Sequence, residues 1–253
     1  MTTGLLTVAG LGPGPDEWVT PAVREALQSA EFILGYRAYT ARITPQPGQI
    51  VEASDNREEL DRARRALTLA AEGRRVAVVS GGDPGVFAMA AAVFEAVESG
   101  PLAWRALDIR IEPGVTAMLA ASARIGAPLG HDFCAISLSD NLKPWPLIEK
   151  RLRLAAEADF VIALYNPASK ARPEQARRAL ELMRACRAPD TIVILARAAG
   201  RPDEDITVTT LAAADATTID MRTLVLIGSS ATRTIARGNG GVWVYTPRAV
   251  ARV

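Results

Sequence analysis

Cysteine and histidine are scarce in this chain of 253 residues, which has two cysteines and one histidine. Cys134 and Cys186 stand outside any C-x-x-C pair and lack a histidine-rich partner sequence, which argues against a disulfide framework and against a metal site. No apolar run reaches the roughly 18 residues of a membrane-spanning helix, and the first residues lack the basic and then apolar layout of a signal peptide. We therefore expect a cytoplasmic protein that binds neither a metal ion nor a membrane.

An excess of charge of one sign is also lacking. The 29 basic residues face 28 acidic ones, which gives a net charge of +1. Without a net positive field, counterion release would contribute little to binding a phosphate backbone, so we expect no nucleic-acid partner. The length suits a globular protein with one large α/β domain or two domains of ordinary size.

A glycine-rich turn ends the first apolar run of the chain. Gly10-Leu-Gly-Pro-Gly14 overlaps the end of the strand-like run Leu5–Leu11, and its glycines permit positive φ and close approach of a ligand to main-chain amides. This is typical of a nucleotide loop. The dinucleotide fingerprint would need glycine where Pro15 stands, and a carboxylate at the end of the second strand, where Leu34 runs into Gly35. A nicotinamide dinucleotide is therefore disfavoured, and a tight turn without a ligand stays the alternative.

Strand-length apolar runs alternate with helical periodicity along the chain. The alternation predicts a mainly parallel sheet at first, and the closely spaced late strands predict a mixed sheet with antiparallel members. Pro113 and Gly114 interrupt the pattern, so we expect two α/β domains, residues 1–113 and 114–253. The expected strands are Leu5–Leu11, Phe32–Leu34, Gln49–Glu52, Val76–Ser80, Ile109–Glu112, Phe133–Leu138, Phe160–Tyr165, Thr191–Arg197, Ile206–Thr209, Thr223–Gly228 and Gly241–Tyr245. The expected helices are Pro21–Ala30, Arg57–Glu72 (ended by Gly73), Val86–Ser99, Thr116–Gly126, Pro146–Glu157 and Pro173–Cys186.

Further strands end in turns rich in glycine, proline and small polar residues. These turns are Gly81–Gly85, Glu112–Ala117, Tyr165–Ser169 and Arg197–Arg201. Any one of them alone could be structural. Because ligands of α/β sheets collect at the carboxyl ends of strands, these turns and the opening glycine turn together indicate one binding cleft.

Three of the turns carry a resemblance to a known family. Gly10-Leu-Gly-Pro-Gly14, Ser80-Gly-Gly-Asp-Pro-Gly85 and Glu112-Pro-Gly-Val-Thr-Ala117 resemble the motifs of the tetrapyrrole methylases. The resemblance spans about Leu5 to Arg233. It implies two α/β domains of the class III methyltransferase type, S-adenosylmethionine bound in a cleft between them, a tetrapyrrole substrate and a homodimer.

Other segments narrow the resemblance within that family. Gly130-His-Asp-Phe-Cys134, Ile136-Ser-Leu-Ser-Asp140, Pro144-Trp145 and Leu164-Tyr-Asn-Pro167 resemble members that methylate carbon 17 of a precorrin. The resemblance implies that methyl transfer is coupled to contraction of the macrocycle, in cobalamin biosynthesis. It implies metal-free precorrin-3B as the substrate, with the cobalt-containing counterpart of the anaerobic pathway as the alternative. The sequence departs from the pattern at Ala198, where asparagine is expected.

The same resemblance assigns cofactor contacts, mostly through main chain, to the strand-end turns. Asp83 could instead initiate an Asx turn, Thr116 could cap the helix that follows it, and Tyr165 could belong to the core. The implied cofactor contacts are Pro13, Gly82, Asp83, Val86, Phe87, Thr116, Ala117, Tyr165, Asn166, Ala198 and Thr223.

Ring contraction calls for a base, and the carboxylates of the substrate call for basic side chains. His131 and Asp140 are the two candidates for the base, with a capping contact and an Asx turn as their structural alternatives. A nicotinamide oxidoreductase and a tetrapyrrole carrier without turnover remain the other classes of protein to consider. The expected substrate contacts, whose basic members could instead be solvated surface charges, are Gly12, Gly14, Arg37, Lys143, Lys170, Arg172 and Arg201.

Overall fold

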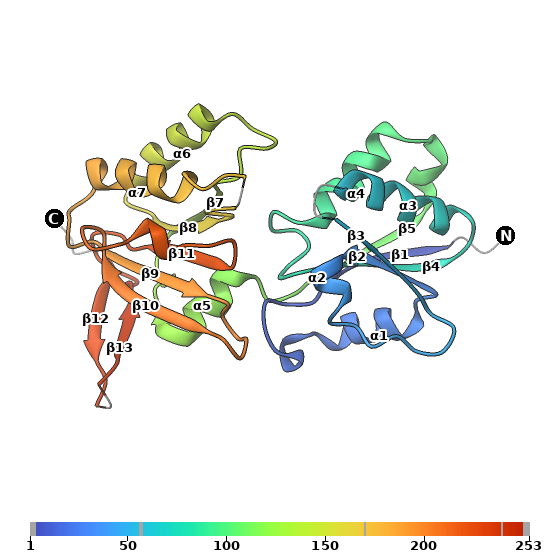
Figure 1. The fold of residues 1–253 in the computed structure, drawn as a ribbon, viewed down its shortest axis with the longest axis horizontal. Helices are drawn as coiled ribbons and strands as arrows, with labels where there is room; N and C mark the ends of the chain where they lie inside the picture. Colours follow the sequence, from blue (N-terminus) through green and yellow to red (C-terminus); the bar gives the residue numbers. More distant parts are fainter. Residues whose placement is uncertain (1–3, 56–57, 170, 239, 250–253) are drawn as a thin grey trace. The chain divides into compact units, whose positions relative to one another are not determined.

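The computed structural model describes residues 4–55, 58–169, 171–238 and 240–249, in which the chain forms two compact units (Figure 1). The first unit ends at Thr116 and the second begins at Ala117. Each contains a five-stranded sheet with helices on both faces. Among the described residues, no helix has the length and apolar character needed to cross a membrane.

The sheet of the first unit is parallel throughout, in the order β3-β2-β4-β1-β5. Side chains alternate across it: Val76 and Val78 pack against α3 and α4, whereas Ala77 and Val79 pack on the other face with Val23 of α1. Because the strands are parallel, their carboxyl ends lie at one edge. The elements are β1 (Leu5–Gly10), η1 (Asp16–Trp18), α1 (Pro21–Ser29), β2 (Phe32–Tyr36), α2 (Arg37–Thr40), β3 (Ile50–Ser54), α3 (Glu59–Ala71), β4 (Arg75–Ser80), α4 (Met89–Ser99), η2 (Leu102–Ala106) and β5 (Asp108–Glu112).

Helix ends in this unit follow local signals. Thr20 caps α1 by accepting a hydrogen bond from the Val23 amide at 3.2 Å. Gly73, with φ of 86°, ends α3 as the sequence predicts. The helix expected from Val86 begins three residues later, because Phe87 has φ of 53° and cannot belong to a helix. The short helix α2 was not predicted, and Arg57, the expected start of α3, lies outside the described residues.

The sheet of the second unit is mixed, as the closely spaced late strands predict. Its order is β10-β9-β11-β8-β7, where β7 is parallel to β8 and β11 is antiparallel to both β8 and β9. Helices α6 and α7 cover one face, and α5 covers the other. A separate sheet has the order β12-β13-β6; β12 was missed because its four residues are all exposed and lack an apolar alternation. The elements are α5 (Ala117–Ile125), β6 (Gly126–Ala127), β7 (Phe133–Ser137), α6 (Trp145–Glu157), β8 (Val161–Tyr165), α7 (Gln175–Cys186), β9 (Ile192–Arg197), β10 (Asp205–Thr210), η3 (Ala216–Thr218), β11 (Thr223–Ile227), β12 (Arg233–Ala236) and β13 (Val242–Tyr245).

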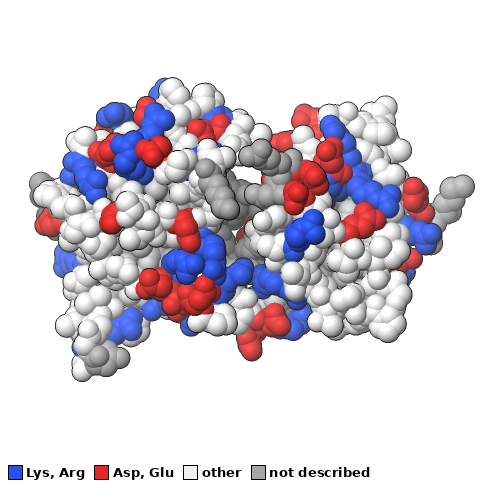
Figure 2. Space-filling model, in the orientation of Figure 1, with Lys and Arg blue, Asp and Glu red and all other residues white. Residues whose placement is uncertain are grey.

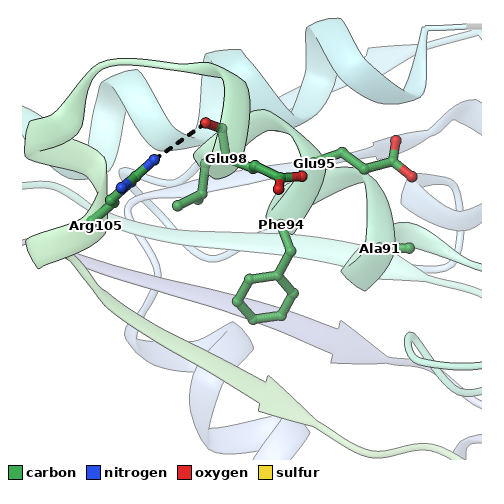
Figure 3. Close-up of a pocket in the computed structure, with 6 residues that line it drawn as sticks. Ala91, Phe94, Glu95, Glu98 and Arg105 are labelled. Carbon is green, nitrogen blue, oxygen red and sulfur yellow. Dashed lines mark hydrogen bonds between the residues drawn. The ribbon is translucent and has the colours of Figure 1, made fainter.

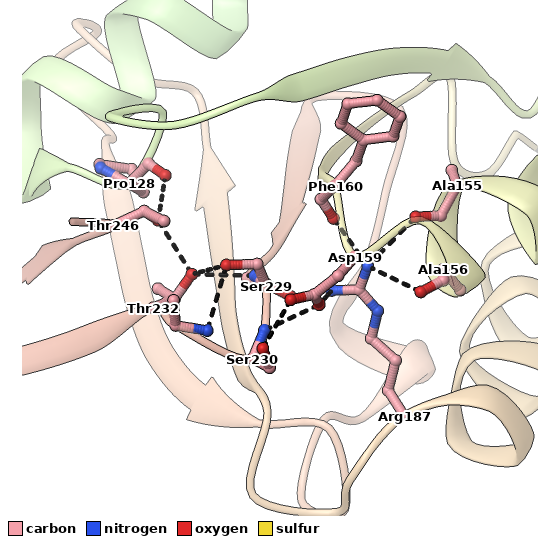
Figure 4. Close-up of polar contacts among 12 residues, drawn as sticks. Pro128, Ala155, Ala156, Asp159, Phe160, Arg187, Ser229, Ser230, Thr232 and Thr246 are labelled. Atoms are coloured by element: carbon pink, nitrogen blue, oxygen red, sulfur yellow. Dashed lines mark hydrogen bonds and ion pairs between the residues drawn. The ribbon is translucent and has the colours of Figure 1, made fainter. Parts of the chain in front are cut away.

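A buried arginine joins several segments of the second unit (Figure 4). The Arg187 side chain is only 4% exposed, and its guanidinium donates to the carbonyls of Gly228 and Phe160 and to two carbonyls in the last turn of α6. Asp159 lies 3.6 Å from this guanidinium and accepts the amide of Ser230 at 2.9 Å. Burial lowers the pKa of Arg187, against the opposing attraction of Asp159. This arginine therefore connects α6, the start of β8 and the end of β11.

Charged side chains of both signs are mixed over the face drawn in Figure 2. Among the described residues, exposed side chains form ion pairs such as Arg65 with Glu52 at 2.9 Å and Arg177 with Glu181 at 2.6 Å. Exposed pairs of this kind contribute little to stability.

Candidate functional site

Three strand-end turns of the first unit meet at the carboxyl edge of its sheet. The opening turn, Gly10–Gly14, joins the turn after β4 through a hydrogen bond from the Gly12 amide to the Gly82 carbonyl at 3.1 Å. A Cβ on Gly114 would lie 2.3 Å from the Gly82 oxygen and 2.7 Å from the Gly10 oxygen. Such distances are far below van der Waals contact, so only glycine lets the turn after β5 approach the other two.

Asp83 fastens two of these turns. One carboxylate oxygen accepts the Gly85 amide at 2.8 Å, and the other accepts the Gly114 amide at 3.1 Å. The first bond is the Asx turn that the sequence offered as the structural alternative, and the structure confirms it. The second bond joins the turn after β4 to the turn after β5. A direct contact of Asp83 with a cofactor stays a prediction.

The polar groups of the opening turn are largely engaged inside the unit. Arg42 donates to the carbonyl oxygens of Leu11 at 2.8 Å, Gly12 at 2.8 Å and Gly14 at 2.9 Å. The Leu11 amide donates to the carbonyl of Ser80, the last residue of β4, and the Gly12 amide donates to the carbonyl of Gly82 in the turn that follows. Gly12 is buried, whereas Pro13 and Gly14 are half-buried. Pro13 and Gly14 are therefore the more accessible residues of this turn, and contact of a ligand with Gly12, Pro13 or Gly14 stays a prediction.

The other residues predicted in the first unit follow the same edge. A Cβ built on Gly82 would lie 3.8 Å from the Cα of Thr116, so these two predicted contacts are neighbours. The Val86 amide donates back to the turn after β4 at 3.3 Å, and Phe87 is 49% exposed. Arg37 is exposed and begins α2 directly after β2. The structure thus places these residues on turns at the carboxyl ends of the strands.

In the second unit, four predicted cofactor contacts lie at one sheet edge. Tyr165 ends β8, Asn166 follows it, and Ala198 follows β9. Thr223 starts the antiparallel strand β11 and is paired with Arg197, the last residue of β9. The mixed topology therefore brings the start of β11 to the carboxyl ends of β8 and β9, where the sequence alone could not place it.

Hydrogen bonds orient the side chains of Tyr165 and Asn166. The Asn166 amide nitrogen donates to the hydroxyl of buried Ser137 at 3.0 Å, and its backbone is left-handed with φ of 52°. The Tyr165 hydroxyl accepts the amide of Met118 at 3.1 Å, in the first turn of α5 beside Ala117. The core interpretation of Tyr165 is therefore incomplete, because its hydroxyl fixes the start of α5.

Ala198 has an unusual backbone for its residue type. It is buried with φ of 52°, a conformation that asparagine and glycine adopt more readily than alanine. The asparagine that the family resemblance implies at this position would fit that backbone. The main-chain amide of Ala198 donates to the Arg222 carbonyl at 3.0 Å, and the Ala198 carbonyl accepts the Arg201 amide at 2.9 Å. The Thr223 hydroxyl donates to Asp220 at 2.9 Å, so a ligand contact of Thr223 would use main chain.

Ion pairs stabilise the end of the sheet that holds Ala198 and Thr223. Arg197 binds Asp220 at 2.9 Å and lies 3.4 Å from Asp203, which in turn binds Arg222 at 2.7 Å. Burial would raise the pKa of Asp220, but hydrogen bonds from Arg197, Thr223 and the Arg222 amide hold that pKa below its ordinary value. These carboxylates stabilise the turn that contains Ala198.

The two candidate bases lie at opposite ends of the strands of this sheet. His131 precedes β7, and the five residues of that strand, at about 3.3 Å each, separate it from the edge that holds Tyr165. Its Nδ1 accepts the Asp132 amide at 2.7 Å. This is the capping contact offered as the structural alternative, and the structure does not bring His131 to the other predicted residues of this unit.

Asp140, in contrast, follows β7 and lies at the predicted edge. Its carboxylate accepts both hydrogen bonds of the Gln175 amide nitrogen, at 3.2 and 3.1 Å, and lies 3.9 Å from the Arg172 guanidinium. Arg172 also donates to the Leu138 carbonyl at 3.4 Å, and its side chain is only 11% exposed. Arg172 therefore supports the loop after β7, which sequence spacing did not indicate.

Two further basic residues predicted to bind substrate, Lys143 and Arg201, lie in loops of the second unit. Lys143 lies in the loop after β7, where burial and then the charge of Arg151 lower its pKa. Arg201 is half-buried in the turn after β9. Lys170 lies outside the described residues.

Two hollows lie in the first unit. Figure 3 shows one on α4 and η2, where Arg105 donates to the Glu98 carbonyl at 3.5 Å and Phe94 is half exposed. It contains none of the predicted site residues. The other, of about 280 Å³, is lined in part by Leu11 and Arg42, beside the opening turn.

Comparisons with known proteins agree with the motifs. The family model of the tetrapyrrole (corrin/porphyrin) methylases matches residues 5–215. The chain is 60% identical to a precorrin-3B C(17)-methyltransferase of Sinorhizobium sp over 246 residues, and the aligned region covers 97% of each protein. It is 43% identical to a probable cobalt-factor III C(17)-methyltransferase of Salmonella typhimurium, over 90% of this chain and 94% of that protein.

Solved structures share the fold. The crystal structure of the methyltransferase CobJ is 56% identical and matches with a TM-score of 0.92, over 96% of this chain and 100% of that one. A uroporphyrin-III C-methyl transferase of Thermus thermophilus, complexed with S-adenosyl homocysteine, has a TM-score of 0.66 at 21% identity, over 89% of this chain and 97% of that one. At that identity it shows the fold alone. The chain belongs to the tetrapyrrole (corrin/porphyrin) methylase family.

Proposed function

We propose that this chain transfers a methyl group from S-adenosylmethionine to carbon 17 of precorrin-3B, with coupled ring contraction to precorrin-4, in cobalamin biosynthesis. The observation that carries the proposal is the 60% identity, over 97% of the chain, to a relative that bears the name of this activity. The strand-end turns support it, since within each unit they bring residues that the family resemblance assigned to the cofactor to one end of the sheet.

The composition of these turns fits S-adenosylmethionine better than a phosphorylated nucleotide. The cofactor has no phosphate, and the opening turn presents Pro13 and Gly14 with several of its main-chain groups already engaged. The edges of an adenine suit main-chain N–H and C=O groups, and the oriented Asn166 amide adds a polar side chain. The residues that we propose to contact the cofactor are Pro13, Gly82, Asp83, Val86, Phe87, Thr116, Ala117, Tyr165, Asn166, Ala198 and Thr223.

The residues of the chain would act chiefly by positioning. When bound, S-adenosylmethionine supplies a methyl group that is already activated on a sulfonium. Fixed turns, such as those fastened by Asp83 and by Ser137, would hold the reacting groups in line and exclude water, which contributes much of the rate in such transfers.

The proton removed during ring contraction requires a base on the protein. Asp140 and His131 both stay proposed for this role. Placement favours Asp140, because it lies after β7 at the edge that holds Tyr165, whereas His131 lies at the opposite end of that strand. Arg37, Lys143, Lys170, Arg172 and Arg201, with Gly12 and Gly14, stay proposed for the substrate.

A second candidate activity is methylation of the same carbon in a cobalt-containing substrate. The 43% identity to a probable cobalt-factor III C(17)-methyltransferase favours it. We further propose that the chain acts as a homodimer in the cytoplasm. Size-exclusion chromatography with light scattering would test whether it forms a dimer.

The decisive experiment incubates the purified chain with methyl-labelled S-adenosylmethionine and either metal-free precorrin-3B or cobalt-factor III. We expect label transfer and an absorbance change with precorrin-3B. Label transfer with the cobalt substrate alone would establish the second candidate. Tetrapyrrole binding without a methylated product in either arm would indicate a carrier, and binding of NADH in place of S-adenosylhomocysteine would indicate an oxidoreductase.

A further inference from the structure

Arg42 makes a contact with the opening turn that the proposed reaction leaves unexplained. It follows α2, and its guanidinium bonds three carbonyls that lie 28 to 31 positions earlier in the chain. Nη1 donates to Gly12, and Nη2 donates to both Leu11 and Gly14, with distances of 2.8 to 2.9 Å. These are short bonds from a charged donor, which are stronger than bonds between neutral groups.

The bonds lie on both sides of one residue. The carbonyls of Gly12 and Gly14 lie on either side of Pro13, so a single planar group holds the Gly12–Pro13 peptide unit and the Gly14–Pro15 peptide unit. Proline has no amide hydrogen to donate. The pairing of Gly12 with Gly82 fixes the start of the turn, and Arg42 adds an anchor at Gly14.

We propose that Arg42 is a positioning residue for the methyl donor, which holds Pro13 and Gly14 in the conformation that the cofactor binds. This inference rests on the proposed function, in which Pro13 contacts S-adenosylmethionine. Arginine is required because its donors form a planar fork, whereas a lysine ammonium is a single point that cannot reach three separated carbonyls with the same geometry. Arg42 acts through the turn and need not touch the reacting atoms.

The test measures S-adenosylhomocysteine binding to the full chain by calorimetry, for Arg42→Met, Arg42→Lys and the control Arg64→Met. Arg64 lies on α3 with a side chain that is 53% exposed. We expect binding to Arg42→Met to be about tenfold weaker, the loss of about one hydrogen bond to a charged group. Arg42→Lys should recover part of it, and the control should bind as the wild type does. Added guanidinium ion, well below denaturing concentration, should restore binding to Arg42→Met only.

Hydrogen exchange gives a readout that needs no ligand. In Arg42→Met without ligand, the amides of Leu11 and Gly12 should exchange faster than in the wild type, while those of β9 should not change. Equal affinity in Arg42→Met and the wild type would overturn the inference and leave the proposed function standing. Failure of the wild type to bind S-adenosylhomocysteine would instead overturn the proposed function. If Arg42→Met does not fold, wild-type affinity in Arg42→Lys would overturn the inference in the same way.

Discussion

Replacement of Arg187 by methionine should destabilise the second unit strongly. The change keeps much of the apolar volume and removes every hydrogen bond that the guanidinium donates to main-chain carbonyls. The two carbonyls of α6 keep other partners, because they also accept the amides of Asp159 and Phe160. The carbonyls of Gly228 and Phe160 lose a bond whose replacement by water would require opening of the structure, since the Arg187 side chain is 4% exposed.

The size of the effect follows from these two carbonyls. An unsatisfied buried acceptor costs about 1–3 kcal/mol. Removal of a buried charge offsets part of that cost, because its desolvation penalty is no longer incurred. Asp159 contributes little, since it is 45% exposed and still binds Ser230. We therefore expect the free energy of unfolding to fall by about 3 kcal/mol, the cost of two unsatisfied carbonyls less the desolvation penalty that is removed.

Urea unfolding followed by tryptophan fluorescence measures this change, and hydrogen exchange of the β8 and β9 amides assigns it to the second unit. Separate readouts are needed because two units need not unfold in one transition. Arg153→Met, at an exposed position of α6, is the matched control and should stay within about 0.5 kcal/mol of the wild type. If Arg187→Met were no less stable than this control, the role assigned to the Arg187 bonds would be refuted.

Three further predictions concern the site. Gly114→Ala should abolish S-adenosylhomocysteine binding, because the added Cβ would lie 2.3 Å from the Gly82 oxygen. The control Gly238→Ala, whose Cβ meets open space, should bind normally. Calorimetry on both variants measures this, and equal affinities would contradict the prediction. Ala198→Gly should leave the urea midpoint unchanged or raise it, because glycine relieves the left-handed backbone, while Ala196→Gly in β9 should cost about 1 kcal/mol; equal losses would contradict the strain. Asp140→Asn should slow ring contraction more than methyl transfer, and His131→Ala should change neither; the reverse pattern in product analysis would assign the base to His131.

Short-range signals in the sequence were sufficient for most of the longer helices and strands and for the positions of the turns, but not for the short elements α2 and β12. Gly73 ends a helix and Thr20 begins one through contacts within four residues, so their effects can be read from neighbouring letters. The closely spaced late strands indicated antiparallel members, which the sheet of the second unit contains. The motifs at Ser80–Gly85 and Glu112–Ala117 identified the family before any fold was known, because close packing of turns demands particular residue types.

Contacts between distant positions decided the rest. Arg42 reaches the opening turn from about 30 positions away, and Asp83 bonds the Gly114 amide from 31 positions away, and no spacing rule links such pairs. Only the strand directions show that Thr223 joins Tyr165 at one edge while His131 lies at the other. The sequence by itself determined that glycine-rich turns end the strands and which family they belong to. The tertiary structure decided which polar groups of those turns are already engaged, because hydrogen bonds across a folded chain depend on the direction of each backbone group and not on composition.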